Sequence, residues 1–190
     1  MENVKRVTIL QLPFILHLSS ILHFTLILMK SILLIRHAKS SWDDPSLSDF
    51  DRPLNERGKK NAPEMSVRLH DRGIRLDMLV SSPAKRAKQT AKAFQKILDV
   101  ERLEFVDELY LAAPATFAKV IRELPGEVNS VAIFSHNPGI TDFANSLSTT
   151  RIDNMPTASV FAINAAITDW ADFTAQHSAF SFFDYPKANH

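Results

Sequence analysis

Three short apolar runs recur along the chain. They are Ile32–Ile35, Met78–Val80 and Val131–Phe134, and no polar residue interrupts any of them. A strand covered on both faces of a parallel sheet has this continuous pattern, whereas a strand with one face in water alternates apolar and polar residues. We therefore predict three buried, parallel strands at these positions.

The stretches between these runs have helical periodicity. Apolar residues recur at spacings of three and four in the stretches 87–98, 117–124 and 140–147. This spacing places them on one side of a helix, as in amphipathic helices that cover a sheet. We predict a helix in each stretch.

A fourth helical pattern covers residues 55–72, with Gly73 as its stop. Pro63 lies inside it and lacks a backbone donor, so we expect the helix to kink or restart there. Asn137 and Pro138 precede the stretch 140–147. They are suited to supply the cap and the first-turn proline of that helix.

After Thr157 the pattern changes to strands, at Ser159–Asn164 and Phe180–Tyr185. Alternation of strands and helices indicates an α/β sheet with helices on both faces. The sequence therefore predicts one domain, residues 29–190, built as a three-layer α/β/α sandwich with a mostly parallel central sheet.

Residues 10–29 form a chargeless, largely apolar run, which resembles a membrane anchor or a signal peptide. His17 and His23 interrupt it, and it enters the predicted strand at 32–35 without a linker. An anchor joined in this way would press the domain into lipid headgroups. We interpret residues 1–28 as an extension with no part in the chemistry, Met29 being an alternative start. A membrane anchor is the alternative.

Composition narrows the function classes. The 190 residues carry a net charge of +1, so no basic field draws the protein to nucleic acid. Cysteine is absent, which excludes disulfides and thiol nucleophiles and fits a cytoplasmic location. No two histidines have ligand spacing on one helix, so we expect neither a metal site nor a cofactor.

The residues that follow the predicted strands carry the candidate chemistry. Arg36 and His37 follow the first run, Arg86 lies one helical turn beyond the second, and His136 follows the third. Glu108 follows a weaker strand pattern. Ligands of open α/β sheets bind at the carboxyl ends of the strands, next to helix amino-termini that favour anions. We therefore expect these side chains to form one site for a small anion.

Phosphate fits these residue types best. Arginine pairs bidentately with phosphate oxygens, so Arg36 and Arg86 are suited to bind it. Histidine can attack phosphorus through a neutral ring nitrogen, while a protonated His136 would neutralise charge on the phosphoryl oxygens. Glu108 is the candidate acid that protonates the leaving atom. Each residue alone is typical of a structural or surface side chain; their combination at strand ends indicates a site.

Four pieces of the sequence resemble motifs of the histidine phosphatase superfamily, in particular its SixA-type phosphohistidine phosphatase branch. They are LIRHAK at 34–39, RPLNERG at 52–58, SSPAKRAKQTA at 81–91 and SHNPG at 135–139. The resemblance extends from Met29 to about Pro186. It implies a phosphoglycerate mutase-like fold and a cofactor-independent phosphatase.

The resemblance also implies roles for individual residues. His37 resembles the phosphoacceptor, Arg36 and Arg86 the phosphate-binding arginines, and His136 the second histidine of the pocket. Glu108 is similar in position to the acid of the wider family.

Two further residues are candidate substrate contacts. Arg52 resembles an additional phosphate or substrate contact of the SixA branch. Asn137 stands where the family often has glycine, beside the second histidine.

The short stretch between Arg86 and His136 leaves no room for the inserted lid of sugar-phosphate mutases. An open pocket suits phosphohistidine on another protein, which is our leading hypothesis for the substrate. A small phosphomonoester is the second hypothesis, and a non-catalytic phosphate-binding module is the third.

Overall fold

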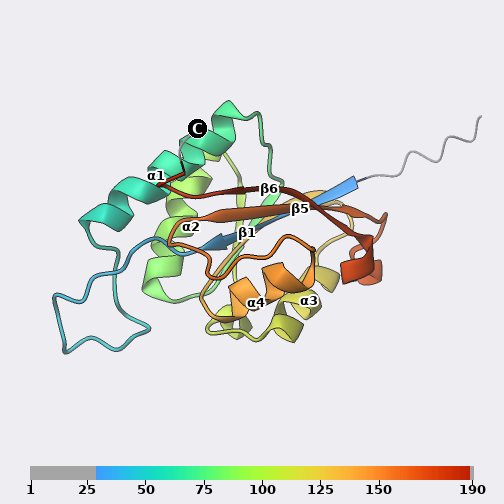
Figure 1. The fold of residues 1–190 in the computed structure, drawn as a ribbon. Helices are drawn as coiled ribbons and strands as arrows, with labels where there is room; N and C mark the ends of the chain where they lie inside the picture. The colour runs from blue at the N-terminus through green and yellow to red at the C-terminus, as the bar shows by residue number, and fades with distance from the viewer. Residues whose placement is uncertain (1–28, 189–190) are drawn as a thin grey trace, which may run out of the picture.

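A computed structural model describes residues 29–188. Its six strands form one sheet in the order β3-β2-β4-β1-β5-β6 (Figure 1). The strands are β1 Met29–Arg36, β2 Met78–Ser81, β3 Arg102–Phe105, β4 Ser130–Ser135, β5 Val160–Ala166 and β6 Ser178–Asp184. The three apolar runs are confirmed as the strands β1, β2 and β4, which are adjacent at the centre of the sheet.

The sheet is mostly parallel, as the sequence predicts. β3, β2, β4 and β1 pair in parallel, whereas β5 runs antiparallel to β1, and β6 antiparallel to β5. In register, Ile35 of β1 lies opposite Phe134 of β4, and Arg36 opposite Ser135. The carboxyl ends of β1 and β4 therefore lie side by side, and β2 ends next to β4.

Four helices cover the two faces of the sheet. α1 is Glu56–Asp71, α2 Lys85–Leu98, α3 Pro114–Arg122 and α4 Gly139–Ser146. Alternate strand residues point to opposite faces. Leu33 and Ile35 pack in one core with residues of α1 and α2, and Ile32 and Leu34 pack in another core with residues of α3 and α4. Figure 1 shows α1 and α2 on one side of the sheet and α3 and α4 on the other. The predicted three-layer sandwich is confirmed.

α1 continues through Pro63 to Asp71, so the helix does not restart at Pro63, and the kink that was predicted as the other possibility stays a prediction. An interior proline costs about 3 kcal/mol in a helix. Ala62, Met65 and Leu69 on the buried face of α1 pack in the core with residues of α2. Burial of that face offsets the cost of the proline, since most helical stability in proteins comes from tertiary packing.

Gly58 lets α1 approach the segment that follows His37 and Ala38. Its amide donates to the Asn55 side chain at 2.9 Å, which caps α1. A Cβ atom at Gly58 would lie 2.1 Å from the carbonyl oxygen of Lys39. The Lys39 carbonyl is a backbone group, so it cannot move away without shifting the chain beside His37.

We expect Gly58→Ala to lower the free energy of unfolding by about 1–3 kcal/mol, the usual cost of overpacking. Urea denaturation of the wild type and the variant measures this difference in the free energy of unfolding. Gly126→Ala is the matched control, because a Cβ there meets nothing within 4 Å. Equal stability of the two variants would contradict the prediction.

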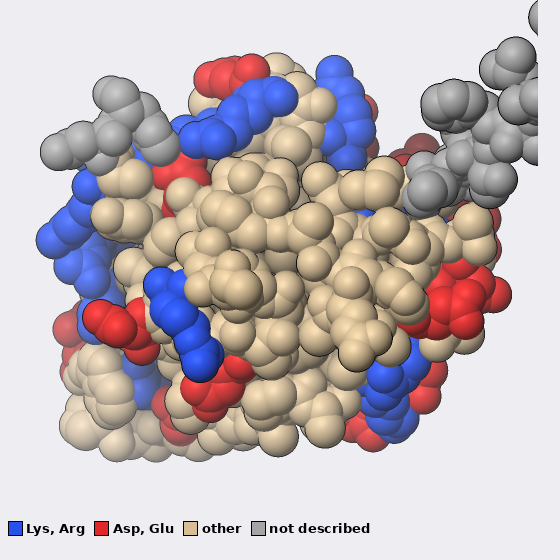
Figure 2. All heavy atoms as spheres, turned by 45° about the vertical axis from the view of Figure 1, so that its right-hand side comes forward, with Lys and Arg blue, Asp and Glu red and all other residues tan. Residues whose placement is uncertain are grey.

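Figure 2 brings forward the side of the molecule that carries the edge strand β6 and shows a broad surface with few charged side chains.

Among residues 29–188, no helix has the length and apolar character needed to cross a membrane. The predicted extension at 1–28 lies outside the described residues, so its role stays a prediction.

Candidate active site

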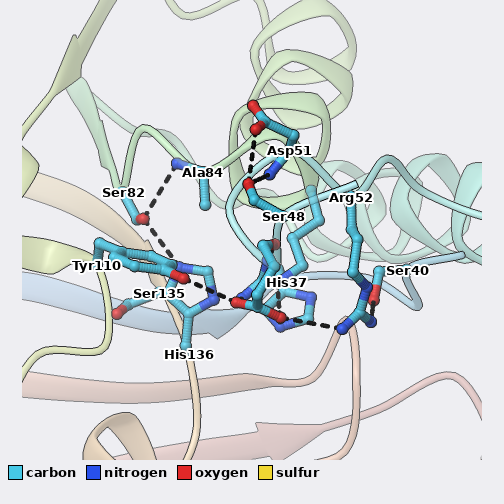
Figure 3. A network of polar contacts seen from close by, with 12 residues as sticks. His37, Ser40, Ser48, Asp51, Arg52, Ser82, Ala84, Tyr110, Ser135 and His136 are labelled. Atoms are coloured by element: carbon cyan, nitrogen blue, oxygen red, sulfur yellow. Dashed lines mark hydrogen bonds and ion pairs between the residues drawn. The ribbon is translucent and has the colours of Figure 1, made fainter. Parts of the chain in front are cut away.

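The predicted site residues meet where the central strands end. Arg36 ends β1 and His37 follows it, while His136 follows β4. Arg86 lies in the first turn of α2, which begins shortly after β2. Because β2, β4 and β1 are neighbours in the sheet, the three segments converge, and the rings of His37 and His136 lie 4.9 Å apart between centroids (Figure 3).

His37 is buried and hydrogen-bonded through both ring nitrogens. Its Nδ1 lies 2.8 Å from the carbonyl oxygen of Ala38. A carbonyl only accepts, so Nδ1 carries the hydrogen and Nε2 has the free lone pair. The Nε group of Arg86 donates to that Nε2 at 3.2 Å. Nε2 is therefore a neutral nitrogen next to a permanent positive charge.

Burial lowers the pKa of His37 to about 3, and the charges of Arg86 and Arg36 add to this, although the hydrogen bond to Ala38 opposes it. A neutral imidazole at physiological pH is the form in which histidine acts as a nucleophile. The surroundings of His37 thus keep it in its reactive form.

His136 is also neutral. Burial, His37 and Arg86 lower its pKa to about 2 in the site formed by the protein groups alone, and the protonated ring expected beside a bound phosphate stays a prediction. A phosphate dianion beside the ring would oppose these effects, because a nearby negative charge favours the charged form of histidine. His136 Nε2 lies 2.8 Å from the Ser82 hydroxyl (Figure 3).

Two buried nitrogens at this site have no hydrogen-bond partner among the described residues. They are Nε of Arg36 and Nδ1 of His136. Arg36 is held elsewhere, through a 2.6 Å bond from Nη1 to the carbonyl oxygen of Met155. Buried polar atoms are nearly always paired, and exceptions call for a functional explanation. An anion bound in the pocket beside Arg36 would be one such partner.

The two neutral histidines predict how stability depends on pH. Histidine in an unfolded chain has a pKa of about 6.5, and in the fold these two have values of about 3 and 2. Between pH 6.5 and about 3 the unfolded chain binds more protons at these positions. The free energy of unfolding therefore falls as the pH is lowered through this window.

We expect His136→Gln to make that decline shallower, as measured by urea denaturation at pH 7 and pH 5 in phosphate-free buffer. His70→Gln is the control, because the His70 side chain is 53% exposed, and its decline should match the wild type. An unchanged decline in the His136 variant would contradict the prediction.

Arg52 belongs to the same site. Its side chain is buried, with Nε 3.0 Å from the Ser41 carbonyl oxygen and Nη2 2.5 Å from the Ser40 hydroxyl (Figure 3). The exposed indole of Trp42 stacks on its guanidinium, 3.2 Å from Cζ to the ring centroid. Arg52 and Trp42 line a pocket of about 220 Å³ together with Arg36, His37, Lys39, Ser40, Asp49, Arg86 and Thr157.

Glu108 is not part of this cluster. Its side chain is 53% exposed and forms an ion pair with Lys119 at 2.8 Å. The short 3₁₀-helix η1, Asp107–Leu109, buries Leu109 instead. The residue from this segment that reaches the site is Tyr110, whose ring meets that of His136 edge-on at 5.4 Å (Figure 3).

Asn137 does not cap α4, contrary to the prediction. The N-cap of α4 is Pro138, and no side chain caps the helix. The Asn137 amide donates to the Met155 carbonyl oxygen at 3.1 Å, and its oxygen accepts from the Thr141 hydroxyl at 2.8 Å. Asn137 thereby fixes the segment at Met155 that also holds Arg36.

Sequence reasoning missed Asp49, Tyr110 and Thr90. Asp49 bonds both Arg52 and Arg86 from a loop without secondary structure, and no periodicity marks it. Thr90 accepts from the Ala38 amide at 3.0 Å and donates to the Arg86 carbonyl at 2.7 Å. Its position one turn after Arg86 was the available signal.

No group of three or more histidine or acidic side chains in residues 29–188 is arranged to hold a metal ion. The site contains the guanidinium groups of Arg36, Arg52 and Arg86 beside the neutral rings of His37 and His136. Such groups are suited to bind a small anion.

Known proteins share this sequence pattern. A family model for the histidine phosphatase superfamily, branch 1, matches residues 32–113. An uncharacterized protein of Mycobacterium tuberculosis is 31% identical over 163 residues, which cover 80% of this chain and all of that protein. The chain belongs to the histidine phosphatase superfamily. An uncharacterized chloroplastic protein of Arabidopsis thaliana is 28% identical over 75% of this chain and 70% of its own length.

Solved structures of histidine phosphatases have the same fold. A candidate phosphohistidine phosphatase SixA from Agrobacterium tumefaciens has a TM-score of 0.70 and 28% identity, over 83% of this chain and 98% of that one. SixA complexed with tungstate has a TM-score of 0.70 and 22% identity, over 82% and 97%. The predicted phosphoglycerate mutase-like fold is confirmed. The superfamily assignment supports phosphatase activity on a phosphorylated substrate.

Proposed function

We propose that this histidine phosphatase hydrolyses phosphohistidine on proteins through a phosphoryl intermediate on His37. The proposal rests on one observation: Nε2 of His37 is neutral and accepts a hydrogen bond from Nε of Arg86 at 3.2 Å. Nε2 forms the bond to phosphorus as the bond from phosphorus to the substrate nitrogen breaks. Water then attacks the phosphorus, which releases inorganic phosphate and regenerates neutral His37.

Arg36, Arg86 and Arg52 would neutralise the phosphoryl oxygens in this reaction. Phosphoryl transfer depends mainly on positioning and on such charge neutralisation. His136 would add a further hydrogen bond, through the buried Nδ1 that has no protein partner.

The environment of the carboxylates favours a nitrogen leaving group. Glu108 pairs with Lys119 at the surface. Asp49 contacts two arginines. Burial raises the pKa of Asp49, but the hydrogen bond from Tyr110 and the charges of Arg86 and Arg52 outweigh burial, so the pKa is lowered overall. Glu108 therefore lies away from the site, and Asp49 is held as a carboxylate rather than as an acid that could donate a proton. An alkoxide leaving group needs such an acid, whereas imidazole leaves with the proton that it already carries in protonated phosphohistidine.

The test compares kcat/KM of the full chain on a phosphohistidine-bearing protein and on a panel of sugar, nucleotide and aryl phosphate esters. We expect a preference for the phosphohistidine protein. Efficient hydrolysis confined to esters would overturn the proposal and favour a small-molecule phosphomonoesterase. Phosphate binding without turnover on any substrate would favour a binding module.

A further inference from the structure

Asp49 joins two of the three arginines that line the pocket. Its Oδ1 lies 2.9 Å from Nη1 of Arg52, and its Oδ2 lies 2.8 Å from Nη2 of Arg86. The Tyr110 hydroxyl donates to the same Oδ2 at 2.8 Å. One carboxylate on the loop between β1 and α1 thus contacts Arg52 on the same loop and two side chains from other parts of the fold, Arg86 of α2 and Tyr110 after η1.

Asp49 holds Arg86 at the end remote from the nucleophile. Nη1 of Arg86 donates to the Asp49 backbone carbonyl and Nη2 to its carboxylate, while Nε donates to Nε2 of His37. A guanidinium is planar and rigid, with its donors in a fixed fork. Fixing the two outer nitrogens therefore fixes the direction of the Nε–H group, which is the part that faces the reacting nitrogen.

Asp49 also offsets the repulsion between the arginines. Arg86 and Arg52 are both buried, and each of them bonds one oxygen of Asp49. Like charges that are close and shielded from water repel strongly unless an opposite charge lies between them. Without the carboxylate, the guanidinium groups would move apart and the Nε–H group of Arg86 would turn away from His37.

We propose that Asp49 is a positioning residue, which orients Arg86 toward His37 and toward the phosphoryl group of the substrate. The inference rests on the proposed phosphatase function of the same site. The Asp49 carboxylate repels a bound anion, but by orienting Arg86 it supports binding of the phosphoryl group.

Asp49→Asn tests the proposal in the full chain. Asparagine keeps the shape of the side chain, but its amide accepts from one arginine and turns an NH₂ group toward the other. We expect kcat/KM to fall about 10- to 100-fold, since small misplacements of catalytic groups cost up to about 10² in rate. Asp49→Glu restores the carboxylate and should recover part of the loss.

Asp51→Asn is the matched control. Asp51 lies on the same loop, is exposed, and its carboxylate accepts from Ser48 at 2.6 Å. We expect wild-type kcat/KM for this variant. A loss as large as that of Asp49→Asn would overturn the proposal, because it would show that the loop as a whole and not the Asp49 carboxylate is responsible.

A second measurement does not depend on turnover. Calorimetry gives the affinity of each variant for inorganic phosphate. Removing a negative charge from an anion site strengthens phosphate binding by electrostatics alone, so weaker binding by Asp49→Asn would show that orientation of the arginines is lost. We expect a several-fold weaker affinity. Tighter binding with unchanged or faster turnover would overturn the proposal and make Asp49 a competitor of phosphate.

A double variant asks whether Asp49 acts through Arg86. If it does, Asp49→Asn should lower the phosphate affinity only slightly once Arg86→Ala is present. The losses of affinity in the two single variants should then be far from additive in the double variant. Additive losses in phosphate affinity would overturn the proposal. The affinity measurements retain their meaning even if the wild type fails to hydrolyse phosphohistidine, so failure of the inference and failure of the proposed function are distinguishable.

Discussion

Replacing His37 by alanine is expected to abolish phosphatase turnover, with a loss of about 10⁴-fold or more, as on removal of other enzymatic nucleophiles. His37 supplies the neutral Nε2 that faces Arg86, and the neighbouring His136 is bonded to Ser82 through its own Nε2. No other described histidine is close enough to replace it. Turnover and trapping with ³²P-labelled substrate measure the effect: the wild type should give an acid-labile phosphohistidine, and the variant no label.

His70→Ala is the control for this experiment, because His70 is exposed on α1. It should retain both turnover and label. Label on His136 in the His37 variant, or wild-type turnover, would show that the nucleophile is assigned to the wrong ring.

Arg86→Ala is expected to lower kcat/KM by about 10²–10³, the cost typical of losing one preorganised donor to a developing charge. The side chain is 4% exposed and contacts both His37 and Asp49, so its removal also frees the Asp49 carboxylate inside the anion site. The loss should therefore appear in both kcat and KM, as steady-state kinetics can resolve.

Lys85→Ala is the matched control for Arg86→Ala, since Lys85 precedes Arg86 in α2 and is exposed. We expect its kinetics to equal those of the wild type. A similar loss in the two variants would indicate a general effect of positive charge near the pocket, and would remove the specific role of Arg86.

The sequence predicts the fold well because each strand and helix has its own local pattern of apolar residues, and these patterns together indicate the same α/β arrangement. The apolar runs at β1, β2 and β4 correspond to strands buried on both faces, and helical periodicity locates α2, α3 and α4. One prediction that the structure does not bear out, a restart of the helix at Pro63, rested on a backbone rule alone. Packing of the buried face of α1 overrides that rule, and such packing is not visible in a single segment.

Site residues at the ends of strands can be predicted from the sequence, whereas site residues on irregular loops cannot. Arg36, His37 and His136 follow buried strands, so the order of the sheet brings them together. Glu108 also follows a strand, but the turn of η1 directs it to Lys119. Asp49 approaches Arg86 from an irregular loop, and nothing in its neighbourhood in the sequence encodes that contact.

The link through Thr90 has a consequence for the evolution and engineering of this protein. Thr90 ties the chain after His37 to the helix that carries Arg86, so the reacting groups form a rigid block on the sheet and α2. Trp42 is an exposed residue of the loop between β1 and α1, which also carries Asp49 and Arg52. If the proposed function holds, replacing Trp42 alone should change which phosphorylated substrates bind, while Thr90 keeps His37 and Arg86 in place.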